Sequence, residues 1–158
     1  MLSVRPGTSL DEDAALALWQ ADLARREQRS GGALAQQFRQ RLRSPQALLL
    51  VGEQAARPEG MLLAEFGRAD AAGVPVGDGE GAQVPGLLHV GVLVARPGST
   101  AARALLRSVT ERFTWITAWA DEPGPYELSG FVRTGREAAG AVHLERRIDP
   151  PGLTQPDT

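Results

Sequence analysis

The chain has 158 residues, 42% of them apolar, which is enough to fold as one domain around one hydrophobic core. Its formal net charge of −2, with neither a basic tail nor a run of arginines, argues against a nucleic-acid partner. Without cysteine it has no disulfide, thiolate metal site or cysteine nucleophile, and two histidines are too few for a His-rich site, so we expect no metal.

The beginning of the chain, MLSVRPGTSLDED, has neither the basic nor the apolar region of a signal peptide. No apolar run approaches the roughly 20 residues that a membrane span needs. We therefore expect a cytoplasmic protein with no membrane partner.

The first 45 residues predict one short strand, over 2–5, followed by two helices. Thr8 or Ser9 can cap the first helix, whose first turn carries the acidic run at 11–13. Because carboxylates are favoured at the positive end of a helix, this run is better explained by the helix dipole than by a metal site. The apolar stripe of this helix comprises Leu16, Trp19 and Leu23.

The middle of the chain predicts strands. The segments 47–53 and 61–69 are short and apolar, and the turn signal ARPEG between them predicts an antiparallel hairpin. Residues 70–86 form a glycine-rich, acidic loop, which is long enough to be either mobile or functional. A strongly β-prone strand follows over 87–95, with Gly91 near its middle.

The last third predicts a helix over about 99–113, a strand over 114–120, and at most two helical turns before Gly130. The helix between two strands forms a right-handed crossover, so the strands 87–95 and 114–120 should be parallel. Two final strands and a disordered tail complete the chain, which predicts a mixed sheet with helices on its faces, an α/β or α+β structure. The strands span 131–137 and 141–148, and the tail spans 150–158.

The start of the helix near residue 99 has two interpretations. Its unpaired amides and partial positive charge suit a phosphate, and it follows the end of a strand, where ligands of α/β sheets bind. Gly98 permits close backbone approach, while Ser99 and Thr100 could donate from their hydroxyls. Alternatively, Ser99 or Thr100 simply caps the helix and nothing binds there.

Tyr126 is a second candidate for chemistry. A short helix that ends at Gly130, with that glycine in the left-handed conformation, would place Tyr126 close to the end of the strand 114–120. A phenol can donate a proton to a leaving group. The alternative is a tyrosine that only packs against its neighbours.

The order of elements and three motifs together resemble the GNAT superfamily of acyl-CoA-dependent N-acyltransferases. The resemblance spans residues 2 to 148 and implies one domain over 1–149. The fold it implies is a mixed, mostly antiparallel sheet of about seven strands flanked by about four helices. The motifs are VRPGTSLDED at the start, GSTAARALL at 98–106, and YELSGFVRTGRE with VHLER near the end.

The resemblance implies where acetyl-CoA would bind. Backbone amides of a loop of the type (Q/R)-x-x-G-x-(G/A) hold the pyrophosphate in this family, and the preceding strand pairs with the pantetheine arm. The tyrosine of Y-E-x-x-G-F, here Tyr126, would act as general acid near the sulfur. The matching cofactor-binding positions are Val92, Leu93 and Val94 in the strand, then Arg96, Gly98, Ser99, Thr100, Ala101, Ala102 and Arg103.

The resemblance therefore implies transfer of an acetyl group to a primary amine of a small molecule or peptide, by direct attack on the thioester. Glu65 and His89 are the candidates for assisting deprotonation of the amine. The acidic residues around Tyr126 would attract a cationic amine, or belong to a solvated surface. Association into a homodimer is a further expectation for this fold.

The loop before the helix is shorter than the family pattern, and Thr100 stands where that pattern has a glycine. These departures support an alternative function, a non-catalytic GNAT-like binding or scaffolding module.

Overall fold

A computed structural model describes residues 2–25, 32–71, 75–76 and 81–148 of the chain. The tail predicted to be disordered at 150–158 lies outside these residues, as do 72–74 and 77–80 of the predicted loop at 70–86.

The described elements follow the predicted order. None of their helices combines the length and hydrophobicity that crossing a bilayer requires. The elements are β1 (Ser3–Pro6), the 3-10 helix η1 (Ser9–Asp11), α1 (Glu12–Arg25), α2 (Gly32–Leu42), β2 (Ala47–Gln54), β3 (Arg57–Ala69), β4 (Pro75–Val76), β5 (Ala82–Ala95), α3 (Ala101–Thr110), β6 (Trp115–Ala120), α4 (Gly124–Leu128), β7 (Val132–Ala138) and β8 (Ala141–Arg147).

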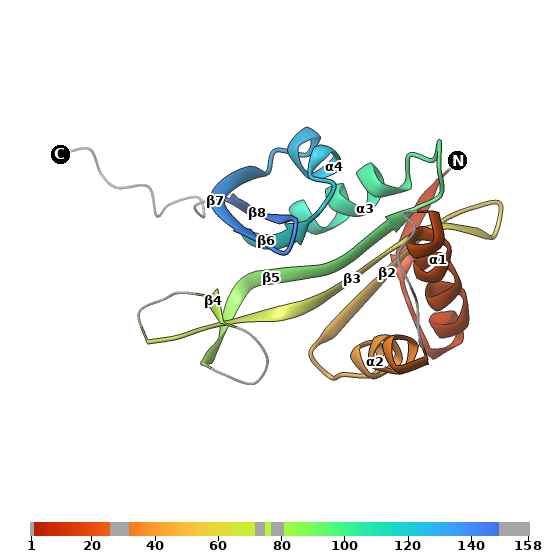
Figure 1. The fold of residues 1–158 in the computed structure, drawn as a ribbon, viewed down its shortest axis with the longest axis horizontal. Helices are drawn as coiled ribbons and strands as arrows, with labels where there is room; N and C mark the ends of the chain where they lie inside the picture. Colours follow the sequence, from red (N-terminus) through yellow and green to blue (C-terminus); the bar gives the residue numbers. More distant parts are fainter. Residues whose placement is uncertain (1, 26–31, 72–74, 77–80, 149–158) are drawn as a thin grey trace.

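The strands form a mixed sheet in the order β1-β2-β3-β5-β6-β8-β7, with the two-residue β4 paired to β3. The predicted hairpin of β2 and β3 is antiparallel, and β5 and β6 are parallel, as the crossover through α3 predicted. Helices α1 and α2 lie on one side of the sheet and α3 and α4 on the other (Figure 1). The structure confirms the predicted fold class.

Alternation along β3 divides the core between the two faces of the sheet. Leu62 and Ala64 pack in the cluster that contains Leu105 and Leu106 of α3. The intervening residues of β3, including Leu63, pack in a second cluster with residues of α1 and α2. Full burial of a leucine side chain contributes roughly 1.5–3 kcal/mol. Because successive side chains of β3 point to opposite faces, the strand stabilises the packing of a helical layer on each face of the sheet.

Two strands begin earlier than predicted. The β2–β3 connection is a two-residue turn in which Ala55 and Ala56 have φ of 54° and 63°, so β3 starts at Arg57 and ARPEG is largely strand. Such turns normally contain Asn or Gly. Because neither residue stands at 55 or 56, the sequence did not indicate the position of this turn. β5 begins at Ala82, because Gln83 and Ala82 continue the ladder opposite Arg68 and Ala69.

The acidic run at the start of α1 is paired with arginines. Thr8 accepts a hydrogen bond from the Leu10 amide through its side chain, while the Thr8 amide donates to Asp11, which completes a capping box. Arg5 makes a two-pronged contact with Asp11, at 2.7 and 2.8 Å. The Arg5 guanidinium, the main cause, lowers the pKa of Asp11 to about 2.

We predict that Asp11→Asn lowers the free energy of unfolding at pH 7 by about 1–2 kcal/mol, because the amide keeps the cap but loses the ion pair. A carboxyl with a lowered pKa stabilises the fold above its unfolded pKa near 4, and this contribution disappears as the pH falls toward 2. Denaturant unfolding of both proteins at pH 7 and pH 2 measures the difference.

The control is Asp13→Asn, since the Asp13 side chain is 89% exposed. Equal losses for the two substitutions, or a loss at position 11 that persists at pH 2, would contradict the assignment.

Candidate functional site

The parallel strands β5 and β6 separate before either of them ends. Their pairing runs from Leu87 opposite Trp115 to Val90 opposite Ala118. On the other edge of β5 the register with β3 shifts at Gly91, so β5 bulges at the same place. Beyond the bulge the two strands diverge and leave a cleft of about 310 Å³.

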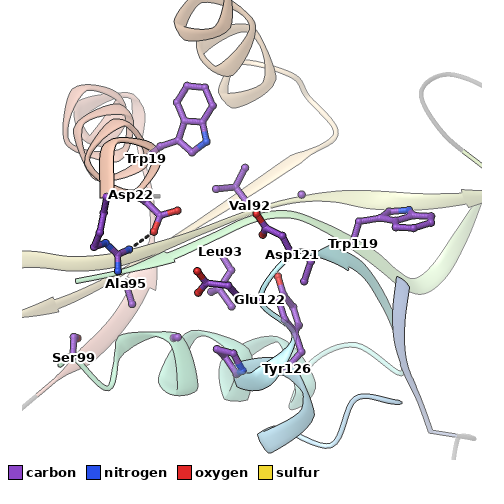
Figure 2. Close-up of a pocket in the computed structure, with 15 residues that line it drawn as sticks. Trp19, Asp22, Val92, Leu93, Ala95, Ser99, Trp119, Asp121, Glu122 and Tyr126 are labelled. Atoms are coloured by element: carbon purple, nitrogen blue, oxygen red, sulfur yellow. Dashed lines mark hydrogen bonds and ion pairs between the residues drawn. The ribbon is translucent and has the colours of Figure 1, made fainter. Parts of the chain in front are cut away.

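Five elements contribute to the wall of this cleft, and Figure 2 shows them converging on one space. Ser99 lies toward one end of the view and Trp119 toward the other, with Asp121, Glu122 and Tyr126 between them. The lining residues are Trp19, Asp22 and Arg25 of α1; Gly91, Val92, Leu93 and Ala95 of β5; Ser99 and Ala102 at the start of α3; Trp119 and Ala120 of β6; Asp121 and Glu122; and Pro125 and Tyr126 of α4.

The Ser99 end of the cleft is formed by the first turn of α3. The Ser99 hydroxyl accepts a hydrogen bond from the Ala101 amide at 3.0 Å, whereas the Thr100 side chain makes no cap bond. The next amides, of Ala102 and Arg103, have no acceptor within the helix. Capping by Ser99 is therefore present, and it still leaves donors of the first turn for a ligand.

Glycine and alanine fix the position of this helix end. Ala101 is fully buried, and a Cβ added at Gly60 of β3 would come within 2.8 Å of the Ala101 Cβ. Gly98 has a φ of 79° and open space where a side chain would stand. Thr100 has a φ of −90°, so it needs no glycine-like conformation. An apolar spacing of Ala102, Leu105, Leu106 and Val109 would predict Ala102 on the buried face of this helix, but Ala101 is the buried residue and Ala102 faces the cleft.

Tyr126 reaches the cleft from α4. The predicted left-handed turn at Gly130 is confirmed, with a φ of 91°, and the Phe131 amide donates to the Tyr126 carbonyl as in a Schellman motif. Tyr126 is 5% exposed, and its ring packs edge-on against that of Phe131. Burial, reinforced by the negative charge of Asp121, raises the pKa of Tyr126 above its ordinary value, so the phenol stays protonated.

The cofactor positions implied by the family resemblance fall into two groups. Val92, Leu93, Ser99 and Ala102 line the cleft, with Gly98 beside them. The others have different surroundings. Val94 packs in the cluster that includes residues of α1 and α2, Ala101 is buried in the core, and Arg103 is exposed. Arg96 donates to the Pro58 carbonyl and lines a smaller cavity of about 160 Å³.

Glu65 and His89 lie together but are not among the lining residues of the cleft. They are directly opposite each other on β3 and β5. The His89 Nδ1 is hydrogen-bonded to the Thr117 hydroxyl at 2.9 Å, and the Arg41 guanidinium lies 3.9 Å from the Glu65 carboxylate. Their role in deprotonating an amine stays a prediction.

Three lining residues were not singled out for chemistry by the sequence. Trp19, assigned to an apolar stripe, stacks on Phe38 at 4.7 Å and still reaches the cleft. Asp22 is buried on α1 and hydrogen-bonded to Arg25. Trp119 packs edge-on against His143, whose pKa is lowered, mainly by burial. No spacing in the sequence connects α1 with β6, so only the folded sheet reveals this grouping.

No protein-family model and no curated protein sequence matches the chain. Solved structures do. "Histone acetyltransferase HPA2 and related acetyltransferase" from Corynebacterium glutamicum matches with a TM-score of 0.69 and 15% identity, covering 96% of this chain and 99% of that one. A GNAT family acetyltransferase from Brucella melitensis in complex with acetyl-CoA matches with a TM-score of 0.65 and 16% identity, over 95% and 90% of the two chains.

PaiA N-acetyltransferase from Thermoplasma acidophilum, in complex with coenzyme A, matches with a TM-score of 0.61 and 11% identity, over 94% and 99% of the two chains. At such identities the likeness concerns the arrangement of the elements, which agrees along nearly the whole length of these proteins. The chain therefore has the GNAT fold, as the sequence motifs implied.

Proposed function

We propose that this protein is an acyl-CoA-dependent N-acyltransferase that transfers an acetyl group from acetyl-CoA to a primary amine. The observation that carries the proposal is the cleft between β5 and β6, with helix-end donors at one end and the buried Tyr126 hydroxyl further in. Two of the solved structures that share this fold are complexes with coenzyme A or acetyl-CoA, which supports the choice of acyl donor.

The residues of the cleft fit such a donor. The first-turn amides of Ala102 and Arg103 would hold the pyrophosphate, and the conformation of Gly98 allows the phosphates to approach the backbone. Beyond Val90 the edge of β5 no longer pairs with β6, so the backbone of Val92 and Leu93 can hydrogen-bond the amides of a pantetheine arm.

Tyr126 would complete the reaction at the inner part of the cleft. The amine nitrogen forms a bond to the thioester carbonyl carbon, the carbon–sulfur bond breaks, and the departing thiolate takes a proton from the phenol. Because the raised pKa keeps the phenol protonated, the proton is available throughout the physiological pH range. Solvent then returns a proton to Tyr126, and the amine proton leaves to a base or to water.

We predict that Ala102→Glu abolishes acetyl-CoA binding without loss of folding stability. A carboxylate in the first turn of α3 suits the helix dipole, but it faces the cleft and repels phosphate. For the unsubstituted protein, acetyl-CoA at about 100 times its Kd should raise the melting temperature by about 5–10 °C. Ala102→Glu should show almost none of this shift.

Ser108→Glu is the matched control, because it adds the same charge to the same helix away from the cleft. It should keep the shift produced by acetyl-CoA. The absence of a shift in the unsubstituted protein would overturn the proposed acyl donor, and a full shift in Ala102→Glu would remove the helix start from the binding site.

We predict that Tyr126→Phe lowers acetyl transfer to an amine more than tenfold while leaving the acetyl-CoA shift nearly unchanged. Phenylalanine keeps the packing against Phe131 and removes only the hydroxyl. Steady-state release of free thiol measures turnover for the two proteins. Equal turnover would exclude Tyr126 from the chemistry, and a shift without turnover of any amine in either protein would favour a binding module.

A further inference from the structure

The cleft ends where the ladder between β5 and β6 begins, directly beside Gly91. Val90 is still paired with Ala118, whereas Gly91 already lines the cleft. In the proposed binding mode a pantetheine arm follows β5 past Leu93 and Val92, and the closed ladder stops it there. The thioester at the end of the arm would therefore lie at the level of Gly91.

Two side chains approach this level from opposite faces of the sheet. Tyr126 belongs to α4 and packs in the core cluster that includes Leu105 of α3. A side chain added at Gly91 would point to the other face, because its Cβ would stand 2.1 Å from Nη2 of Arg41. Arg41 belongs to α2, which lies on the face of the sheet opposite to α3 and α4 (Figure 1). Its guanidinium therefore covers Gly91 from the side that Tyr126 does not reach.

An ion pair holds the Arg41 guanidinium near Gly91 and leaves its hydrogen-bond donors available. The Arg41 Nε lies 3.9 Å from a carboxylate oxygen of Glu65 on β3, which is beyond hydrogen-bond distance. Within the described part of the chain, the Arg41 side chain donates no hydrogen bond. A guanidinium carries five N–H donors in a planar fork, and this side chain is 43% exposed. Its N–H groups can thus bind a ligand while Glu65 keeps the charge in place.

The proposed reaction creates negative charge at the level of Gly91. As the amine nitrogen bonds to the thioester carbon, an electron pair of the carbonyl double bond moves to the oxygen, and it returns when the carbon–sulfur bond breaks. Removing one donor that meets such an oxyanion typically lowers kcat by about 10²–10³-fold. Because a guanidinium stays protonated throughout the physiological pH range, it stabilises this charge without transferring a proton.

Building on the proposed function, we propose that Arg41 is a further catalytic residue, whose guanidinium donates hydrogen bonds to the thioester oxygen as that oxygen becomes negative. Arg41 and Tyr126 then serve different atoms of the thioester from opposite faces of the sheet, the oxygen and the sulfur. Glycine at position 91 has a role in this arrangement, because any side chain there would displace the guanidinium from the strand.

The first test asks whether residue 41 reaches the thioester carbon. The chain contains no lysine, so Arg41→Lys introduces a single lysine amine at this position. With acetyl-CoA alone, that amine should take the acetyl group, because its nitrogen forms an amide while the carbon–sulfur bond breaks and coenzyme A leaves with the proton. Mass spectrometry of the peptides locates the acetyl group.

Arg43→Lys is the matched control for this test. Its side chain lies two residues further along the chain, is 69% exposed and pairs with Glu12. Acetylation at position 41 should be about tenfold or more faster than at position 43, because only the former is held at the reacting carbon. Equal rates at the two positions, or no acetylation at position 41, would overturn the placement of Arg41.

The second test measures catalysis, with the primary amine that the unsubstituted protein acetylates fastest. Arg41→Gln should lower kcat about tenfold or more and leave the KM for the amine nearly unchanged, since the lost interaction forms only in the transition state. Arg43→Gln should keep kcat. Gly91→Ala should also lower kcat, and combining it with Arg41→Gln should add little, because both changes remove the same guanidinium.

An unchanged kcat in Arg41→Gln would overturn the catalytic role, as would a loss confined to the KM of amines that carry a carboxylate. Fully additive losses for Arg41→Gln and Gly91→Ala would overturn the contact on which the role depends.

The acetyl-CoA shift in melting temperature separates this inference from the proposed function. A shift in the unsubstituted protein, without the effects expected at position 41, would overturn the role of Arg41 and leave acetyl-CoA as the donor. The absence of a shift in the unsubstituted protein would overturn the proposed acyl donor, and the role of Arg41 with it.

Discussion

The separation of β5 from β6 is the constraint on which the rest of the site depends. Parallel strands normally continue their ladder, but here it stops at Val90 opposite Ala118, where Gly91 bulges and shifts the register with β3. Backbone groups beyond that point face a cleft instead of a neighbouring strand, and they need other partners. A bound molecule that extends along β5 would supply them, so the interruption of the sheet is also where the proposed binding site begins.

The position of α3 follows from the same part of the sheet. Its first residue, Ala101, is buried against β2 and β3, where Gly52 and Gly60 leave room for it. A larger residue at Gly60 would meet both the Ala101 side chain and the Val94 carbonyl. The close approach holds the amides at the start of α3 beside the divergent strands. Small residues on β2 and β3 therefore determine where an anion could be held, although they do not line the cleft.

Periodicity in the sequence was sufficient for the order and the type of the main strands and helices, and the turn and crossover rules gave the hairpin of β2 with β3 and the parallel pair β5 and β6. It failed at the turn formed by Ala55 and Ala56, because positive φ values at two alanines leave no Gly or Asn to indicate them. The cleft was predictable in part. Tyr126 and the start of α3 stood within local motifs, whereas Trp19 and Trp119 come from elements a hundred residues apart and meet only through the order of strands in the sheet.

The negative charge of Asp121 acts on the Tyr126 phenol in the same direction as burial. Asp121 adds to burial in keeping the phenol protonated, and the same raised pKa makes the phenol a weaker acid towards a thiolate. Asp121 would also raise the pKa of an amine placed directly against it and so oppose its deprotonation, so the proposed reaction requires the attacking nitrogen to lie away from this carboxylate.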